Sequence, residues 1–222
     1  MASISGSIGS STRGVDELWL DVLQQVSART AHELKGALNG VAVNLEVVRS
    51  RSNRPDAPGS AVAPFAASAA DQLDAVVGMT EALLKLARPA REPVDVAETV
   101  DNLSSLLVPS ARAEGISLRV ETPVREIAGC TVRAGGNVVR LVIGSSLLAA
   151  LAQKGDIRCR LEVGAAAVFA IECADAEGPL VLSSDVMTVA AAADIRVQSE
   201  GQSISLSFPR AGAARQRTPE RP

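Results

Sequence analysis

The sequence is poor in the residues from which metal and redox sites are built. Among 222 residues it has one histidine, three cysteines and no tyrosine, and aromatic residues make up 2%. Cys130, Cys159 and Cys173 stand far apart with no C-x-x-C pair, which excludes the pattern of a zinc site or a disulfide framework. We therefore expect no metal and no cofactor in this chain, and we interpret the cysteines as small buried apolar residues.

The chain also lacks a strong charge excess and a long hydrophobic run. Its formal net charge is -3 without a domain-sized basic cluster, which disfavours nucleic-acid binding. No apolar run approaches the ~20 residues of a membrane span. The Ser- and Gly-rich residues 1–13 have no apolar segment of the kind that signal peptides contain. We expect a cytoplasmic protein that binds neither nucleic acid nor a membrane.

Apolar residues are abundant, at 47%, and in the first part of the chain they follow a helical period. Spacings of three and four predict a helix over residues 15–51 and a second helix over residues 65–87. Between them, SNRPDAPGSAVAP contains three prolines and predicts a loop. Residues 14–88 therefore form a helical hairpin that cannot cover its own apolar faces. We expect a second copy to cover them, giving a homodimeric four-helix bundle.

Beyond Pro89 the pattern changes to short elements of both kinds. Periodicity predicts helices over residues 96–113, 138–151 and 185–193, and strands in ISLRVE, IRCRLEV and residues 168–174. DIRVQSE and QSISLSFP are joined at Gly201 and predict a terminal hairpin. Residues 93–209 therefore read as an α+β domain with helices on one face of a mixed sheet. We expect residues 1–13 and 210–222 to be disordered tails.

The single histidine, His32, falls in the middle of the first helix. On a helical wheel it lies opposite the apolar cluster and on the same side as Gly36 and Asn39. Such a histidine can be an ordinary residue on a solvated face. Neither His nor Cys stands at the positions that would complete a metal site, and no G-x-S-x-G motif is present for a hydrolase.

The string AHELKGALNG resembles the phosphoacceptor box of sensor histidine kinases, in which a histidine is followed at once by an acid. In that family the box lies on the first helix of a dimeric hairpin. The resemblance implies that His32 is the phosphoacceptor and that Glu33 acts on its imidazole as base and orienter. This assignment is chemically reasonable because a neutral imidazole nitrogen is a good nucleophile near pH 7.

The box departs from the family pattern just after the histidine. Gly36 stands where the family has Thr or Asn to position a water, and Ala37 stands where a proline often follows. A glycine cannot orient water through a side chain, so we do not expect phosphatase activity. We assign Lys35, Gly36 and Asn39 to the docking of a partner, because bare surface beside the histidine would ease its approach.

The resemblance continues to residue 209, where the second domain resembles a kinase ATP-binding domain that has lost its nucleotide site. Ser146 and Ala150 stand where the family's asparagines reach the magnesium and phosphates. Glu177 and Pro179 replace two glycines of the adenine loop, and VMTVAAAA leaves no room for a Gly-rich lid. Triphosphate binding needs such backbone turns together with a cation or metal. We therefore expect no ATP binding.

The whole pattern resembles bacterial histidine phosphotransferases, which keep the dimeric hairpin and a degenerate ATP-domain-like fold. It implies that His32 relays phosphoryl groups between response-regulator receiver domains, whose own Mg²⁺ neutralises charge during transfer. One alternative is a non-catalytic pseudokinase adaptor that only binds signalling partners. A second is an ATP-dependent kinase with a divergent site.

Overall fold

The computed structural model describes residues 13–54, 58–89, 94–121, 131–174, 176 and 178–210. Most of the two expected tails, together with Cys130 and Glu177, lies outside these described residues. The expectations for those parts of the chain therefore remain predictions.

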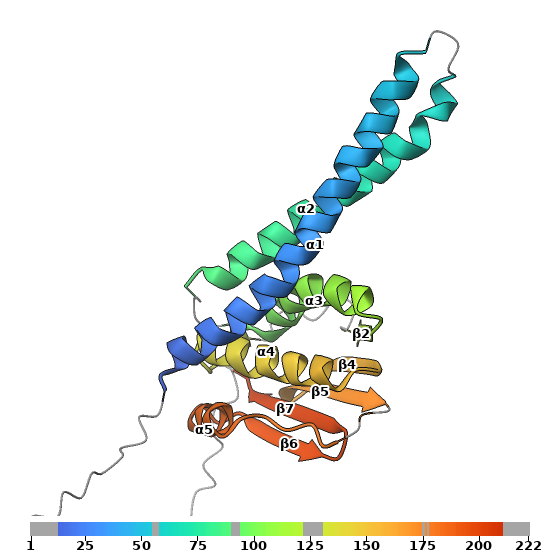
Figure 1. The fold of residues 1–222 in the computed structure, drawn as a ribbon. Helices are drawn as coiled ribbons and strands as arrows, with labels where there is room; N and C mark the ends of the chain where they lie inside the picture. The colour runs from blue at the N-terminus through green and yellow to red at the C-terminus, as the bar shows by residue number, and fades with distance from the viewer. Residues whose placement is uncertain are drawn as a thin grey trace, which may run out of the picture.

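The helical hairpin predicted from the first half of the chain is present (Figure 1). It consists of α1 (Val15–Ser52), the short 3-10 turn η1 (Gly59–Ala61) and α2 (Ala63–Ala87). At the start of α1 the Glu17 carboxylate accepts a hydrogen bond from the Gly14 N–H at 3.3 Å. Acidic residues in the first turn and arginines in the last turn match the helix dipole. The α2 helix begins earlier than predicted because Pro64 suits a first helical turn.

A polar cluster fixes the register of the two hairpin helices. The Asn44 amide donates hydrogen bonds to Ser68 Oγ at 3.1 Å and to Gln72 Oε1 at 3.3 Å. Gly40 makes room for this contact, because a Cβ there would lie 2.5 Å from Gln72 Oε1. The glycine thus lets the Gln72 amide lie directly against α1.

Beyond Pro89, the described residues form a small antiparallel sheet, a larger mixed sheet and three helices. A small sheet pairs β1 (Val94–Asp95) with β3 (Thr131–Val132). The main sheet has the order β2-β4-β5-β7-β6, in which only β2 and β4 are parallel. Its strands are β2 (Ser117–Glu121), β4 (Asp156–Val163), β5 (Ala166–Ala174), β6 (Arg196–Glu200) and β7 (Ser203–Pro209). The helices are α3 (Val96–Ala113), α4 (Gly136–Gln153) and α5 (Ser184–Ala192).

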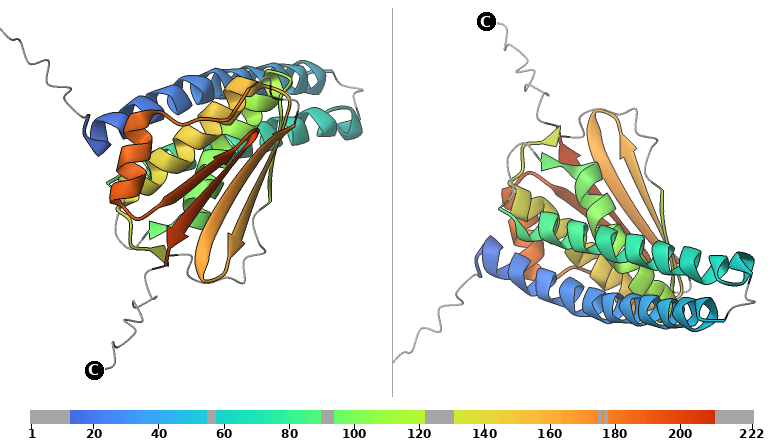
Figure 2. Two further views of the ribbon diagram at one scale, coloured as in Figure 1. Left: turned by 90° about the horizontal axis from the view of Figure 1, so that it is seen from below. Right: turned by 90° about the horizontal axis from the view of Figure 1, so that it is seen from above.

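The main sheet has one buried and one exposed face. Along β4, Ile157, Cys159 and Leu161 are buried, whereas the alternating Arg158, Arg160 and Glu162 are exposed. The three helices lie on the buried side (Figure 2). This arrangement confirms the predicted α+β architecture with helices on one face of a mixed sheet.

The lower half of α1 packs on the helical layer of this α+β unit. Leu18, Trp19, Val22 and Val26 are buried there in the same apolar core as α3 and α4. The approach is close because a Cβ on Gly144 of α4 would lie 2.7 Å from Val22 Cγ1 and 3.6 Å from the Trp19 ring. The sequence analysis predicted that a second copy covers the apolar faces of the hairpin. For this part of α1 that prediction is wrong, because the chain's own helices cover it.

Hydrogen bonds also join the start of α1 and the end of α2 to this layer of helices. The Arg140 guanidinium donates to the carbonyls of Arg88 at 2.8 Å and Lys85 at 3.0 Å, at the end of α2 where carbonyls lack helical donors. The Asn137 amide donates to Asp16 of α1 at 2.8 Å. The hairpin and the α+β unit are therefore joined by apolar packing flanked by hydrogen bonds.

Helix α4 has the length and apolar composition of a membrane span, alone among helices of the described part of the chain. In this fold it is the central helix of the core, and 56% of it is buried. Core helices of this kind commonly match the composition of a span.

The contact at Gly144 can be tested with a matched pair of helical glycines. Gly144→Ala should lower the free energy of unfolding by about 1–3 kcal/mol, because its Cβ overlaps Val22. Gly78→Ala on α2 meets nothing within 4 Å and should instead stabilise by about 0.5–1 kcal/mol. Urea unfolding, followed by the fluorescence of Trp19, measures both. Equal stability of the two variants would contradict the close packing of α1 on α4.

Candidate functional site

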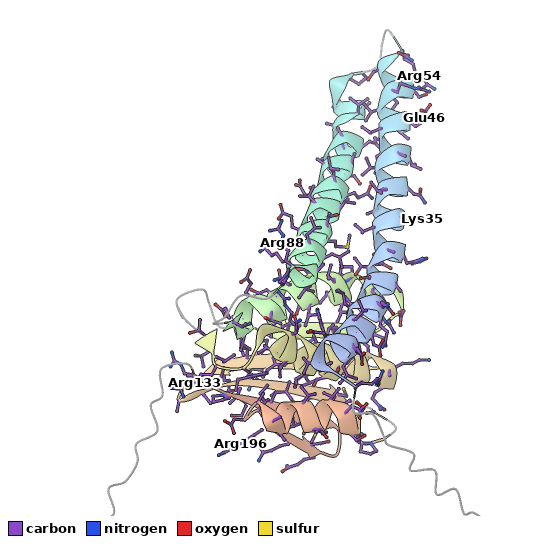
Figure 3. The ribbon with its side chains drawn as sticks, turned by 90° about the vertical axis from the view of Figure 1, so that its left-hand side faces the viewer. Lys35, Glu46, Arg54, Arg88, Arg133 and Arg196 are labelled. Atoms are coloured by element: carbon purple, nitrogen blue, oxygen red, sulfur yellow. The ribbon has the colours of Figure 1, made fainter. Side chains whose placement is uncertain are left out.

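The five residues singled out by the sequence lie on two turns in the middle of α1. His32, Lys35, Gly36 and Asn39 are exposed, whereas Glu33 is half-buried. His32, Gly36 and Asn39 follow one another at spacings of four and three and share a face. Lys35 projects on the side of α1 away from α2 (Figure 3). Exposure of the His32 imidazole, predicted from the wheel, is confirmed.

The turn that precedes His32 contributes one buried side chain and one ion pair to the rest of the protein. Thr30 is fully buried, and its hydroxyl donates a hydrogen bond to the Val26 carbonyl at 2.9 Å. Arg29 forms an ion pair with Glu114, the residue that follows α3. The His32 side chain has no hydrogen-bond partner among the described residues. A supported helical turn thus presents a free imidazole to solvent.

Glu33 faces a different direction from His32. Consecutive residues of a helix project about 100° apart, and Glu33 lies toward α2 and α3. There it lines a groove of about 460 Å³ together with Gly36 and Ala37 of α1. The structure therefore brings Glu33 and Gly36 to the groove and leaves His32, Lys35 and Asn39 on the outer surface.

The opposite walls of this groove come from residues that the sequence did not single out. They are Ala75, Gly78 and Met79 of α2, and Ser105 and Pro109 of α3. The available signal was Pro109, which lies inside the helix predicted over residues 96–113. Proline has no N–H, so the Ser105 carbonyl, four residues earlier, lacks its helical donor.

A second surface of the hairpin carries a row of exposed large apolar side chains. On α1 it contains Leu20, Leu38 and Leu45, and on α2 it contains Leu73, Val77 and Leu84, each about half exposed at 48–52%. Leu20 and Leu84 are exposed although they lie at the level of the α+β unit. The row therefore runs along the side of the hairpin turned away from that unit, and His32 lies about 120° round α1 from it.

The positions matched to the nucleotide-binding asparagines face the packed core. Ser146 and Ala150 of α4 are both 0% exposed, and the Ser146 hydroxyl donates to the Val142 carbonyl at 2.8 Å. A nucleotide has no access to these two side chains in this fold. Within the described ranges, no group of three or more His, Cys, Asp or Glu side chains is placed to hold a metal ion.

Two of the three cysteines lie inside the main sheet, as expected from the sequence. Cys159 and Cys173 are buried free thiols on the covered face of β4 and β5. Burial, with a smaller contribution from Cys173, raises the pKa of Cys159 to about 12. The Cys159 thiol is therefore neutral near pH 7 and acts as a small apolar residue.

The burial of Ser146 predicts the effect of placing an asparagine at this position. Ser146→Asn should destabilise the fold by about 1–3 kcal/mol, because a larger amide would be buried without room or partners. Ser145→Asn, at the adjacent half-buried position, should cost much less. Thermal unfolding compares the two variants. A stable Ser146→Asn protein that also binds ATP would overturn this account of α4.

Comparison with solved structures gives a distant likeness. A solved structure of the histidine kinase AdeS from Acinetobacter baumannii is similar, with a TM-score of 0.39 and 12% sequence identity. The likeness covers 81% of this chain and 98% of that chain. No family model matches the chain, and no curated protein matches it.

Proposed function

We propose that this chain is a histidine phosphotransfer protein of two-component signalling. In this role His32 takes a phosphoryl group from the aspartate of one receiver domain and passes it to another. The observation that carries the proposal is the placement of the chain's only histidine, exposed on a turn of α1 that Thr30 and Arg29 hold in place. Beside it, a Cβ on Gly36 would meet nothing within 4 Å, so a partner can approach closely.

The chemistry asks little of this chain beyond a nucleophile and a surface. A neutral imidazole nitrogen of His32 attacks the phosphorus of the receiver's aspartyl phosphate. The bond from phosphorus to the aspartyl oxygen breaks, and the receiver carboxylate leaves as an anion. Magnesium bound by the receiver neutralises charge during transfer. Glu33 makes no hydrogen bond to His32 among the described residues, so its proposed role is limited to the attraction between its negative charge and the positive charge that develops on the adjacent imidazole. Lys35, Gly36 and Asn39 contact the partner.

A homodimer completes the proposal. The row of half-exposed leucines and valines runs along both helices of the hairpin on the side away from the α+β unit. Water contact costs about 25 cal/mol per Å² of such apolar surface, and a second hairpin laid on the row would form a four-helix bundle. His32 stays outside that interface because it projects about 120° from the row.

We further propose that the protein binds no ATP and acts in the cytoplasm, away from nucleic acid and membrane surfaces. The burial of Ser146 and Ala150 supports the absence of nucleotide binding, because the side chains at these positions cannot reach a triphosphate. Phosphate then has to come from a partner. The Mg²⁺ required by the transfer belongs to the receiver.

The position of the Glu33 carboxylate favours one alternative function, that of a non-catalytic adaptor. Its carboxylate lies toward the groove rather than on the outer face that carries His32. An adaptor that only binds signalling partners would use this groove and would not need the histidine. The two functions differ in what the His32 imidazole contributes.

Variants at two adjacent positions separate transfer from adaptor binding. His32→Gln should keep the free energy of unfolding within about 0.5 kcal/mol, because the side chain is exposed. Phosphoryl transfer from a receiver should vanish while binding of that receiver persists. Glu33→Ala should retain some transfer, because the Glu33 carboxylate lies toward the groove and the nucleophile itself is unchanged. Unchanged signalling in the His32→Gln protein would leave the adaptor as the better account.

Charges placed on two faces of α1 test the dimer. Leu38→Glu combined with Leu45→Glu should yield monomers on light scattering, because the carboxylates would lie on the apolar row. Val43→Glu is the matched control, since Val43 is 65% exposed but lies on another face of the same helix. A wild-type protein that is already monomeric, or a double variant that still dimerises, would contradict the proposed interface.

A further inference from the structure

We infer that the groove beside His32 receives a lysine or arginine side chain of the docking partner. The inference deepens the proposed function and rests on it, because it assigns the partner's contact next to the phosphoacceptor. It concerns the surface between α1, α2 and α3, which includes residues of the α+β unit as well as the hairpin.

The groove is open and its walls are small or apolar. Its volume of about 460 Å³ lies between Ala37 of α1, Ala75 and Met79 of α2, and Pro109 of α3. The space beside Gly36 and Gly78 is open, because a Cβ on either residue would meet nothing within 4 Å. A long side chain from outside can therefore enter without displacing any part of the protein.

The polar groups available to such a side chain are acceptors. Glu33 carries a half-buried carboxylate that makes no hydrogen bond or ion pair with any residue in the described part of the chain. The Ser105 carbonyl lacks its helical donor because residue 109 is proline. The Ser105 hydroxyl donates to the Asp101 carbonyl at 2.8 Å and is therefore occupied as a donor.

Complementarity selects a cation with an aliphatic stem. The stem of a lysine or arginine can pack on Ala37, Ala75 and Met79 while its charged head reaches the Glu33 carboxylate. An acidic side chain would meet a like charge. An apolar one would cover the carboxylate without pairing it, which costs free energy.

The two cations that flank Glu33 along α1 leave the groove free. Arg29, one turn before Glu33, forms its ion pair with Glu114. Lys35 projects on the side of α1 away from α2 (Figure 3). Neither lines the groove, so the Glu33 carboxylate is available to a partner.

A small probe tests the groove directly. Titration of the full chain with n-butylguanidinium, followed by amide signals in NMR spectra, should give saturable shifts at Gly36, Gly78 and Ser105. Glu33→Gln should weaken the binding by about fivefold to tenfold, because it removes the charge that pairs with the probe. n-Butanol, which has the same stem without charge, should bind more weakly. Equal shifts with n-butanol, or none with n-butylguanidinium, would overturn the inference.

A cation supplied by the protein itself tests docking. In Ala75→Lys the new side chain should occupy the groove and exclude the partner's cation. Phosphoryl transfer from receiver domains phosphorylated by acetyl phosphate should then fall by about tenfold. Ala67→Lys, at another exposed position of α2 outside the groove, should change transfer by less than about twofold. Normal transfer in the Ala75→Lys protein would contradict docking through this groove.

The two proposals can fail separately. His32→Gln should bind n-butylguanidinium as the wild type does, because His32 does not line the groove. Probe binding without label on His32 would refute the phosphotransfer function and keep the cation site. Label on His32 without probe binding would refute the cation site and keep phosphotransfer.

Discussion

The packing of α1 on α4 at Gly144 is the constraint on which the rest of the structure depends. A glycine at this position lets Val22 and Trp19 of the hairpin enter the core of the α+β unit. Arg140 fastens the end of α2 to the same layer. The two halves of the chain therefore share one core, and the height of His32 above the α+β unit is set by that core.

In the proposed function, this constraint also limits the possible source of the phosphoryl group. A domain that delivered ATP to His32 would need both an open nucleotide site and freedom to approach the histidine. Here α4 is buried under α1, and Ser146 and Ala150 are enclosed with it. The α+β unit fits the role of a fixed support that also contributes Ser105 and Pro109 to the surface beside the histidine.

Helix α1 has three faces with different surroundings. One face packs on α2 and the α+β unit, a second carries the exposed row with Leu38 and Leu45, and a third presents His32 to solvent. A helix that serves three faces shows no single broad apolar side. In the proposed function each face has its own occupant: the chain itself, a second copy and a receiver.

The sequence predicted the long helices and most strands of the main sheet, because their apolar residues recur at regular spacings, but it missed the two-residue strands β1 and β3. The helix over residues 96–113 and the terminal hairpin at Gly201 lie where the patterns placed them. Periodicity, however, shows that a face is apolar without showing what covers it. The chain's own α4 covers Val22, for instance, while Leu38 stays exposed. The groove was not predictable, because its walls come from three helices whose relative positions the sequence pattern does not show. The one local signal was Pro109, a proline inside a predicted helix.

The central claim is that His32 carries the phosphoryl group. The most direct measurement incubates the protein with receiver domains phosphorylated by acetyl phosphate and locates the label by mass spectrometry under neutral conditions. The account predicts an acid-labile phosphoryl group on His32 that can be passed to a second, unphosphorylated receiver. Label on no residue, or on a serine or aspartate while His32 stays unmodified, would contradict it.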